Sequence, residues 1–205
     1  MKKITLLSAL LLMFIGFSQE KDAQEKDINK RPMKLDYEIS AKLGFSQINS
    51  KDRPTIYGNT AGVSFDFAYY LKNDFRLMTG VQLTEVFTNY LDASVDASMI
   101  MIPLRFRDKL YKYNDDAIVR PFLGAGVYTN YFRRLTIDSE LLGRDRETGI
   151  GWNFGWLVEI GTTFRVNQSN EFMISFESQN DFTNAGDQSY RFANSFFVMG
   201  WTSKF

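Results

Sequence analysis

The chain has 205 residues, about the length of one domain. It contains no Cys, which excludes disulfides and thiolate metal sites, and no His, the usual general base of hydrolases. Its 24 Lys and Arg balance 24 Asp and Glu, so no basic field is available for nucleic acid. Aromatic residues make up 16% of the chain while mean hydropathy stays at −0.25, which is typical of half-apolar strands.

The N-terminus has the order of a secretory signal peptide. Met1-Lys2-Lys3 is basic, and the apolar run from Ile4 to Phe17 is shorter than the roughly 20 residues of a transmembrane helix. We expect residues 1–18 to be a signal peptide that is cleaved after Ser18. The alternative is an uncleaved N-terminal helix, buried or anchored in a membrane. Since there is no Cys at the cleavage site, a lipoprotein is not expected.

Residues 19–34 are rich in charge and have no apolar periodicity. Such a segment cannot bury enough surface to become ordered, so it is predicted to be a flexible periplasmic lead-in. A short charged helix over residues 21–30 is the alternative, but it would have no apolar face to dock.

From Leu35 onward, apolar and polar residues alternate with a period of two, which predicts β-strands. Most of the segments are long enough to cross a bilayer at a tilt, which takes about 9 to 11 residues. The predicted strands cover residues 35–46, 61–71, 75–84, 100–107, 122–131, 152–165, 172–177 and 195–205. This pattern predicts an all-β fold, an eight-stranded antiparallel up-and-down transmembrane barrel over residues 35–205.

The predicted connections alternate in length. Residues 72–74 and 167–170 are tight turns of Asn, Asp and Ser, and residues 108–117 are longer but turn-like. The other connections are longer polar loops: Asn49 to Tyr57, Asn89 to Ala97, Arg134 to Gly149 and Asn184 to Tyr190. Short turns at one end and long loops at the other are the layout of an outer-membrane barrel.

The two faces of the predicted strands differ in polarity. The apolar face has aromatic residues near the strand ends: Tyr37, Phe45, Tyr69, Phe75, Tyr131, Trp152, Phe172, Trp201 and Phe205. The other face carries the polar residues Glu38, Lys42, Asp66, Arg76, Gln82, Arg105, Arg107, Glu159, Arg165 and Glu177.

Alternation does not say which face is inside. Abundant Gly, Ser and Ala on the polar face, with charges of both signs, favour a polar interior, because eight strands leave a narrow bore. We expect no conducting pore. A soluble, periplasmic lipocalin-like carrier of an apolar ligand would have the opposite polarity and is the alternative function.

The last strand is predicted to pair with the first and close the barrel. Phe205 resembles the C-terminal aromatic that the barrel-assembly machinery recognises, although an ordinary buried C-terminal strand would also end in this way. If Phe205 points outward, Phe196 and Val198 point inward. That predicts either an apolar plug at this level of the bore or a bulge that shifts the register.

No catalytic constellation stands out. Glu159 and Glu177 are the remaining paired carboxylates, but Arg165, Arg105 or Arg107 is within reach, which favours structural ion pairs. Gly124-Ala125-Gly126 lies in a strand, so its glycines are expected to make room in the barrel instead of binding phosphate. Asp138-Ser139-Glu140 and Asp145-Arg146-Glu147 are read as solvated loop charges, with a divalent cation site as the alternative. We assign no catalytic, cofactor-binding or metal residues, and we expect no enzyme.

Two motifs resemble those of the outer-membrane β-barrel family common in Bacteroidetes, which includes PorT-like proteins. They are Ile102-Pro103-Leu104-Arg105-Phe106 and Arg120-Pro121-Phe122-Leu123-Gly124-Ala125-Gly126, supported by the Phe17-Ser18-Gln19-Glu20 end of the signal. The resemblance implies an outer-membrane location and, for some members, a role in type IX secretion. It names no catalytic residues.

These observations predict a non-enzymatic outer-membrane protein with a structural or interaction role. Its partners would be membrane lipid, the barrel-assembly machinery through Phe205, and a protein or surface ligand at the long loops, Arg134 to Gly149 first. No nucleic acid and no cofactor are expected.

Overall fold

The computed structural model describes residues 35–51, 54–70, 75–90, 93–110, 117–139, 143–187 and 189–204. The predicted signal peptide, the predicted lead-in and Phe205 lie outside the described residues. Residues 33–205 belong to one structural unit. In the described part of the chain, no helix is long and apolar enough to cross a membrane.

The described residues form eight strands, as the period-two pattern predicts. They are β1 (Leu35–Asn49), β2 (Ile56–Tyr70), β3 (Phe75–Tyr90), β4 (Ala93–Lys109), β5 (Val119–Ser139), β6 (Gly143–Arg165), β7 (Asn170–Asp181) and β8 (Arg191–Lys204).

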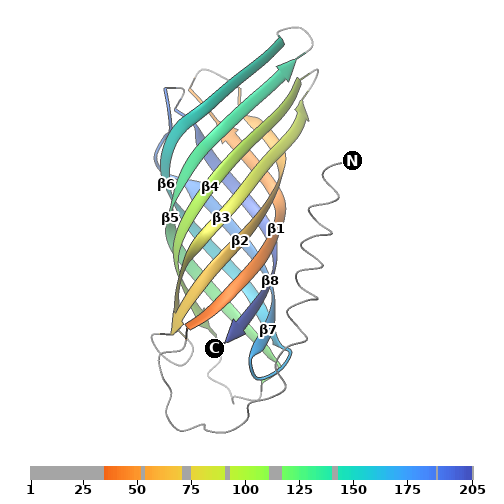
Figure 1. Cartoon of the computed structure of the whole chain (residues 1–205), viewed down its shortest axis with the longest axis vertical. Helices are drawn as coiled ribbons and strands as arrows, with labels where there is room; N and C mark the ends of the chain where they lie inside the picture. Colours follow the sequence, from red (N-terminus) through yellow and green to blue (C-terminus); the bar gives the residue numbers. More distant parts are fainter. Residues whose placement is uncertain are drawn as a thin grey trace. The chain divides into compact units, whose positions relative to one another are not determined.

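The sheet closes on itself (Figure 1). Each strand pairs antiparallel with the next along the chain, and β8 pairs with β1 over Asp36↔Lys204 to Asn49↔Arg191. The predicted fold, an eight-stranded antiparallel up-and-down barrel, is confirmed. Closure gives every strand a neighbour on both sides, although β6 before Gly155 pairs with β5 alone. We call the end with Leu35 and Lys204 proximal and the other end distal.

The polar face is inside, as predicted. Glu38, Lys42 and Asp66 are each 1% exposed or less, whereas Leu43 and Phe65 on the outer face are 47% and 42% exposed. The same contrast recurs around most of the barrel: the buried set includes Arg76, Gln82, Arg105, Arg107, Glu159 and Glu177, and the exposed set includes Leu83, Ile102, Leu104, Val127, Trp156 and Ile160. A lipocalin-like carrier would have the reverse arrangement.

An apolar plug, and not a bulge, explains the inward residues of the last strand. Phe196 and Val198 pack inside the barrel against Phe122 and Met173. Strand β8 pairs with both of its neighbours without a register shift.

Two of the four predicted long loops are wrong. Arg134 to Gly149 forms the end of β5 and the start of β6, paired from Arg134↔Thr148 to Ser139↔Gly143. Asn89 to Ala97 likewise ends β3 and begins β4. In these segments backbone pairing continues, but the alternation of apolar outward and polar inward residues ends, and for this reason the sequence predicts loops there. Among the described residues, the irregular distal segments are 50–51, 54–55, 182–187 and 189–190, and the predicted tight turn at 167–170 is confirmed.

A β-bulge at Arg133 marks a change in the wall of the barrel. Phe132 and Leu135 are both buried inside, and the two consecutive arginines between them, Arg133 and Arg134, are exposed and half-buried, respectively. The register of β5 with both β4 and β6 shifts at this position. One extra residue thus reverses the phase of the alternation along the rest of β5.

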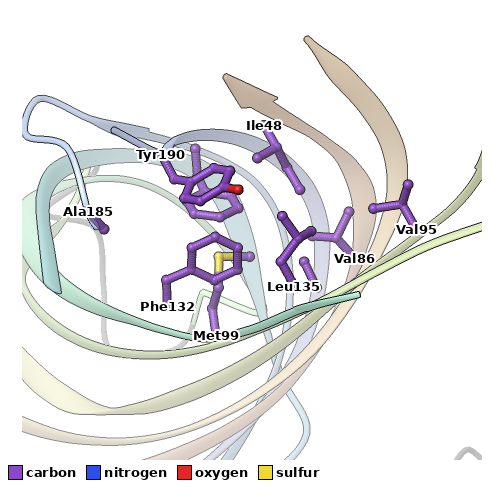
Figure 2. Packing of buried hydrophobic residues seen from close by; sticks show 10 residues of the cluster. Ile48, Val86, Val95, Met99, Phe132, Leu135, Ala185 and Tyr190 are labelled. Atoms are coloured by element: carbon purple, nitrogen blue, oxygen red, sulfur yellow. The ribbon is translucent and has the colours of Figure 1, made fainter. Parts of the chain in front are cut away.

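Distal to this bulge the interior is apolar (Figure 2). Phe132 makes edge-on ring contacts with Tyr190 and Phe192, at centroid distances of 5.3 and 4.5 Å. The buried members of this distal cluster are Ile48, Val86, Val95, Ala97, Met99, Phe132, Leu135, Ala185, Tyr190 and Phe192. The outer face here is exposed and polar, with Glu85, Ser94, Asp96, Arg133, Asp138, Arg144 and Arg146. The polarity of the wall therefore inverts along the barrel.

Candidate functional site

Two arginines of β4 organise the charges inside the barrel. The guanidinium of Arg107 donates to Glu38 of β1 at 2.6 Å and to Glu159 of β6 at 2.9 Å. Both partners are essentially without solvent access. Because charge-assisted, two-ended contacts of this kind fix the planar guanidinium, Arg107 braces three strands across the bore.

Arg105, one pleat further along β4, makes the parallel set of contacts. It donates to Asp66 of β2 and, at 3.0 Å, to Glu177 of β7. Glu177 also accepts from the Lys42 ammonium of β1 at 2.6 Å, and Lys42 in turn donates to Gln82 of β3 at 2.7 Å. The central network thus contacts strands on every side of the bore.

A second cluster lies at the proximal end, around Glu171 of β7. Its carboxylate lies 2.6 Å from the Lys204 ammonium and 3.2 Å from both Lys109 and Arg76. The guanidinium of Arg120 is 4.0 Å away. One carboxylate therefore gathers four cations from four strands beside the closing strand.

A third polar group connects the network to the distal cluster. The Tyr128 hydroxyl donates to Asp181 at 2.7 Å, and the backbone N–H of Phe192 donates to the same carboxylate at 2.8 Å. Asn153 donates to the Tyr190 carbonyl at 3.0 Å. Polar side chains therefore continue along the bore to the distal cluster, and together with the apolar plug they fill it, as expected for eight strands.

The paired carboxylates of the sequence prediction do lie together. Glu159 and Glu177 are opposite each other on β6 and β7. Arg105 lies 3.0 Å from Glu177 and 3.7 Å from Glu159, and Arg107 pairs with Glu159, whereas Arg165 lies at the proximal end of β6 opposite Glu171. The ion-pair interpretation is confirmed with Arg105 and Arg107 as the partners. Buried carboxylates held in this way act as structural cross-links.

The glycines of the fifth predicted strand make room for the wall, as predicted. A Cβ at Gly126 would lie 2.3 Å from the Leu104 carbonyl oxygen and 2.6 Å from the Cα of Arg105. The neighbouring strand thus approaches too closely for any side chain at this position. Gly126 lets β4 carry Arg105 close to the bore centre.

The acidic residues of the predicted loop do not assemble a cation site in the part that the structure describes. Asp138 and Asp145 lie in the β5–β6 hairpin, where Asp138 is opposite Arg144. Glu147 accepts a hydrogen bond from the Tyr190 hydroxyl at 3.1 Å. Among the described residues, no group of three or more carboxylates is arranged to hold a metal ion. Glu140 lies outside those residues.

The outer faces of the distal hairpins carry exposed polar and charged side chains. At the bulge, Arg134 lies 3.7 Å from Glu85 of β3, an exposed ion pair on the outside of the wall. Sequence reasoning placed a contact surface at Arg134 to Gly149 but missed the cluster inside it. A usable signal was the apolar character of alternate positions in a polar stretch, Val86, Val95 and Ala97 among them.

Comparison with known proteins defines the architecture. No protein-family model matches the chain. No curated protein resembles it in sequence. The barrel is similar to solved structures. Neisserial surface protein A (NspA) has 14% identity and a TM-score of 0.56, over 83% of this chain and 97% of that one. Ail, the attachment invasion locus protein of Yersinia pestis, has 11% identity and a TM-score of 0.50, over 85% and 100%. At these identities the similarity establishes the fold.

Proposed function

We propose that the chain is a non-enzymatic outer-membrane protein with a structural or interaction role. One observation carries this proposal: over the proximal part of the barrel, apolar side chains cover the outside while buried ion pairs lie inside. Exposing such an outer face to water costs free energy, whereas a bilayer stabilises it. Backbone pairing closed around the barrel meets the demand that a bilayer makes on polar backbone groups.

The inversion of polarity supports a boundary between lipid and water near Arg133. Proximal to it the wall is apolar outside, as lipid requires, and distal to it the wall is polar outside with an apolar core, as water requires. We assign the interaction role to the distal hairpins β3–β4 and β5–β6. Their outer faces carry charges of both signs and are free to meet a partner outside the cell.

The finer proposal is membership of the PorT-like group and a link to protein secretion. The strand motifs at residues 102–106 and 120–126 support it. The export route that goes with it is a cleaved signal peptide over residues 1–18, followed by a lead-in over residues 19–34 and insertion by the barrel-assembly machinery through Phe205.

Tryptophan quenching tests the membrane assignment. All three Trp residues point outward: Trp152 is 53% exposed, Trp156 is 41% exposed, and Trp201 is half-buried. In vesicles of brominated lipid we expect strong quenching of the fluorescence of the purified protein, compared with vesicles of the unbrominated lipid. Cell fractionation should recover the protein in the outer membrane, from which detergent extracts it.

A lipocalin-like carrier would give opposite results. It would be recovered in the soluble periplasm, and brominated vesicles would leave its fluorescence unchanged. Either result overturns the membrane assignment. The third class, a barrel enzyme, requires that substitution of a bore carboxylate abolish turnover of a lipid or peptide while assembly stays intact.

A further inference from the structure

The outer face of β7 and β8 carries a polar patch that differs from the rest of the wall. We define the β7–β8 patch as Ser178, Asn180, Ala193 and Ser195. Ser178 is opposite Ser195, and Asn180 is opposite Ala193, so the four side chains form one square on two neighbouring strands. All four are small or polar, and all are exposed or half-buried.

This patch lies among apolar side chains of the kind that face lipid. Ser195 is opposite Phe45 of β1, which is 71% exposed, and Asn180 is opposite Trp156 of β6. Proximal to the patch, Phe176 and Phe197 are exposed and their rings are in contact at 5.7 Å. Phe182, directly after β7, is also exposed. Exposed aromatics therefore border most of the patch, while at its distal edge Ala193 is opposite Gln47 of β1 and Arg191 follows on β8.

The polar groups of the patch are unsatisfied by the protein itself. Within the described ranges, the side chains of Ser178, Asn180 and Ser195 make no hydrogen bond to another residue. Water would satisfy such groups if they lay on the distal outer face. Acyl chains cannot, and an amide without a partner in an apolar medium is costly.

The wall beside the proximal edge of the patch is hollowed. A depression of about 650 Å³ extends along the outside from Phe106 and Ala125 through Val158 to Ser178 and Ser195, the two patch residues that line it. Small side chains in a membrane-facing surface let another backbone approach closely, and polar ones then hydrogen-bond across the contact. Both features of the patch suit a protein neighbour within the bilayer.

We propose that the β7–β8 patch is the contact surface for a second copy of this chain. Two copies inserted in the same direction present the patch at the same depth, so a two-fold axis along the membrane normal brings it against itself. Asn and Ser both donate and accept, so each patch can satisfy the other. The inference rests on the membrane assignment, because only lipid leaves these groups without partners.

Cysteine cross-linking tests the contact, and the natural chain contains no Cys that would interfere. The test variant is Ser195→Cys at the patch. The control is Leu83→Cys on β3, three strands away from β8 around the barrel and 49% exposed on the outer face. Mild oxidation of intact membranes should give a species of twice the chain mass for Ser195→Cys and not for Leu83→Cys. Adding Asn180→Leu should lower its yield at least about threefold, because interchain hydrogen bonds are lost.

The membrane assignment is checked separately in the same samples. Both Cys variants must fractionate with the outer membrane and show a heat-modifiable band. If they do and Ser195→Cys stays monomeric, or both variants cross-link equally, the second-copy contact is wrong while the membrane assignment stands. A cross-link to a different protein also overturns the second copy as occupant. Recovery in the soluble fraction overturns the membrane assignment itself.

Discussion

Arg107 of β4 pairs with Glu38 of β1 at 2.6 Å, although these strands are three positions apart around the barrel. The contact crosses the bore instead of following the backbone ladder. Because Arg107 also holds Glu159 of β6, its removal would leave two buried carboxylates with only the more distant Arg105, 4.0 Å from Glu38 and 3.7 Å from Glu159. The central network therefore acts as an internal brace between strands that the sheet does not join directly.

Replacing Arg107 by Met tests this brace. Breaking a buried ion pair on one side typically costs about 3–5 kcal/mol, because the remaining charge stays desolvated. We expect a loss of that size in the free energy of unfolding, measured by urea titration in lipid vesicles. Glu38→Gln in addition should restore part of the loss, since the double variant removes an unpaired charge.

The matched control is Arg144→Met, which removes an exposed arginine from the distal hairpin and should change stability by less than about 0.5 kcal/mol. Equal losses for the two arginines would show that the brace contributes nothing specific.

Phe132→Ala should destabilise the distal part of the barrel. Truncating a buried Phe removes its ring contacts and leaves a cavity, at a cost of about 3–5 kcal/mol. Tryptic cleavage next to Arg133, Arg134 and Arg144 should become faster, because the hairpins lose the core on which they pack. Phe154→Ala, on the outer face of β6, serves as comparison and should leave the cleavage rate unchanged; faster cleavage in both would contradict a specific core.

Gly126→Leu should block assembly. Its Cβ would collide with the backbone of β4, where the Leu104 carbonyl oxygen would be 2.3 Å away. We expect the folded, heat-modifiable form to disappear from unheated gels. Ala125→Leu points outward into the hollow of the wall, so it should assemble normally. Normal assembly of the Gly126 variant would refute the close approach of the two strands.

Deleting Phe205, or replacing it with Asp, should lower the amount of folded barrel in the outer membrane. The physical reason is the predicted recognition of a terminal aromatic by the barrel-assembly machinery. Quantitative gels of heated and unheated membranes measure the folded fraction. Ser203→Ala on the same strand is the control, and an unchanged folded fraction for the Phe205 variants would argue against the signal.

The sequence was informative wherever one rule held along a whole strand. Period two and the lack of charge on one face predicted eight strands, closure and the residues of each face, since a one-residue slip would have exposed every charge. The prediction that the polar face is inside rested on weaker grounds, because the alternation is the same whichever face is inside. The sequence limited the arginine partners of Glu159 and Glu177 to Arg105, Arg107 and Arg165. It did not fix the pairs, since these contacts between distant strands depend on how the barrel closes.

The distal part could not be predicted in the same way. At Arg133 the alternation slips by one residue, and beyond it the inner positions are apolar and the outer ones polar. A search for apolar-out strands therefore stops at Tyr131 on β5 and at Ile100 on β4. The residues beyond have the pattern of a soluble sheet, with polar side chains outside, and a pattern of this kind does not indicate membrane-crossing strands.

The bulge at Arg133 has a consequence for engineering and for divergence of the chain. A single inserted residue changes which positions of β5 face inward. The pattern of apolar and polar residues beyond the bulge is therefore independent of the pattern proximal to it. Hairpins of other lengths, or hairpins with grafted recognition sequences, can replace the distal wall as long as they supply their own apolar core. The membrane-spanning part then stays the same while the distal part is exchanged, with the junction at Arg133.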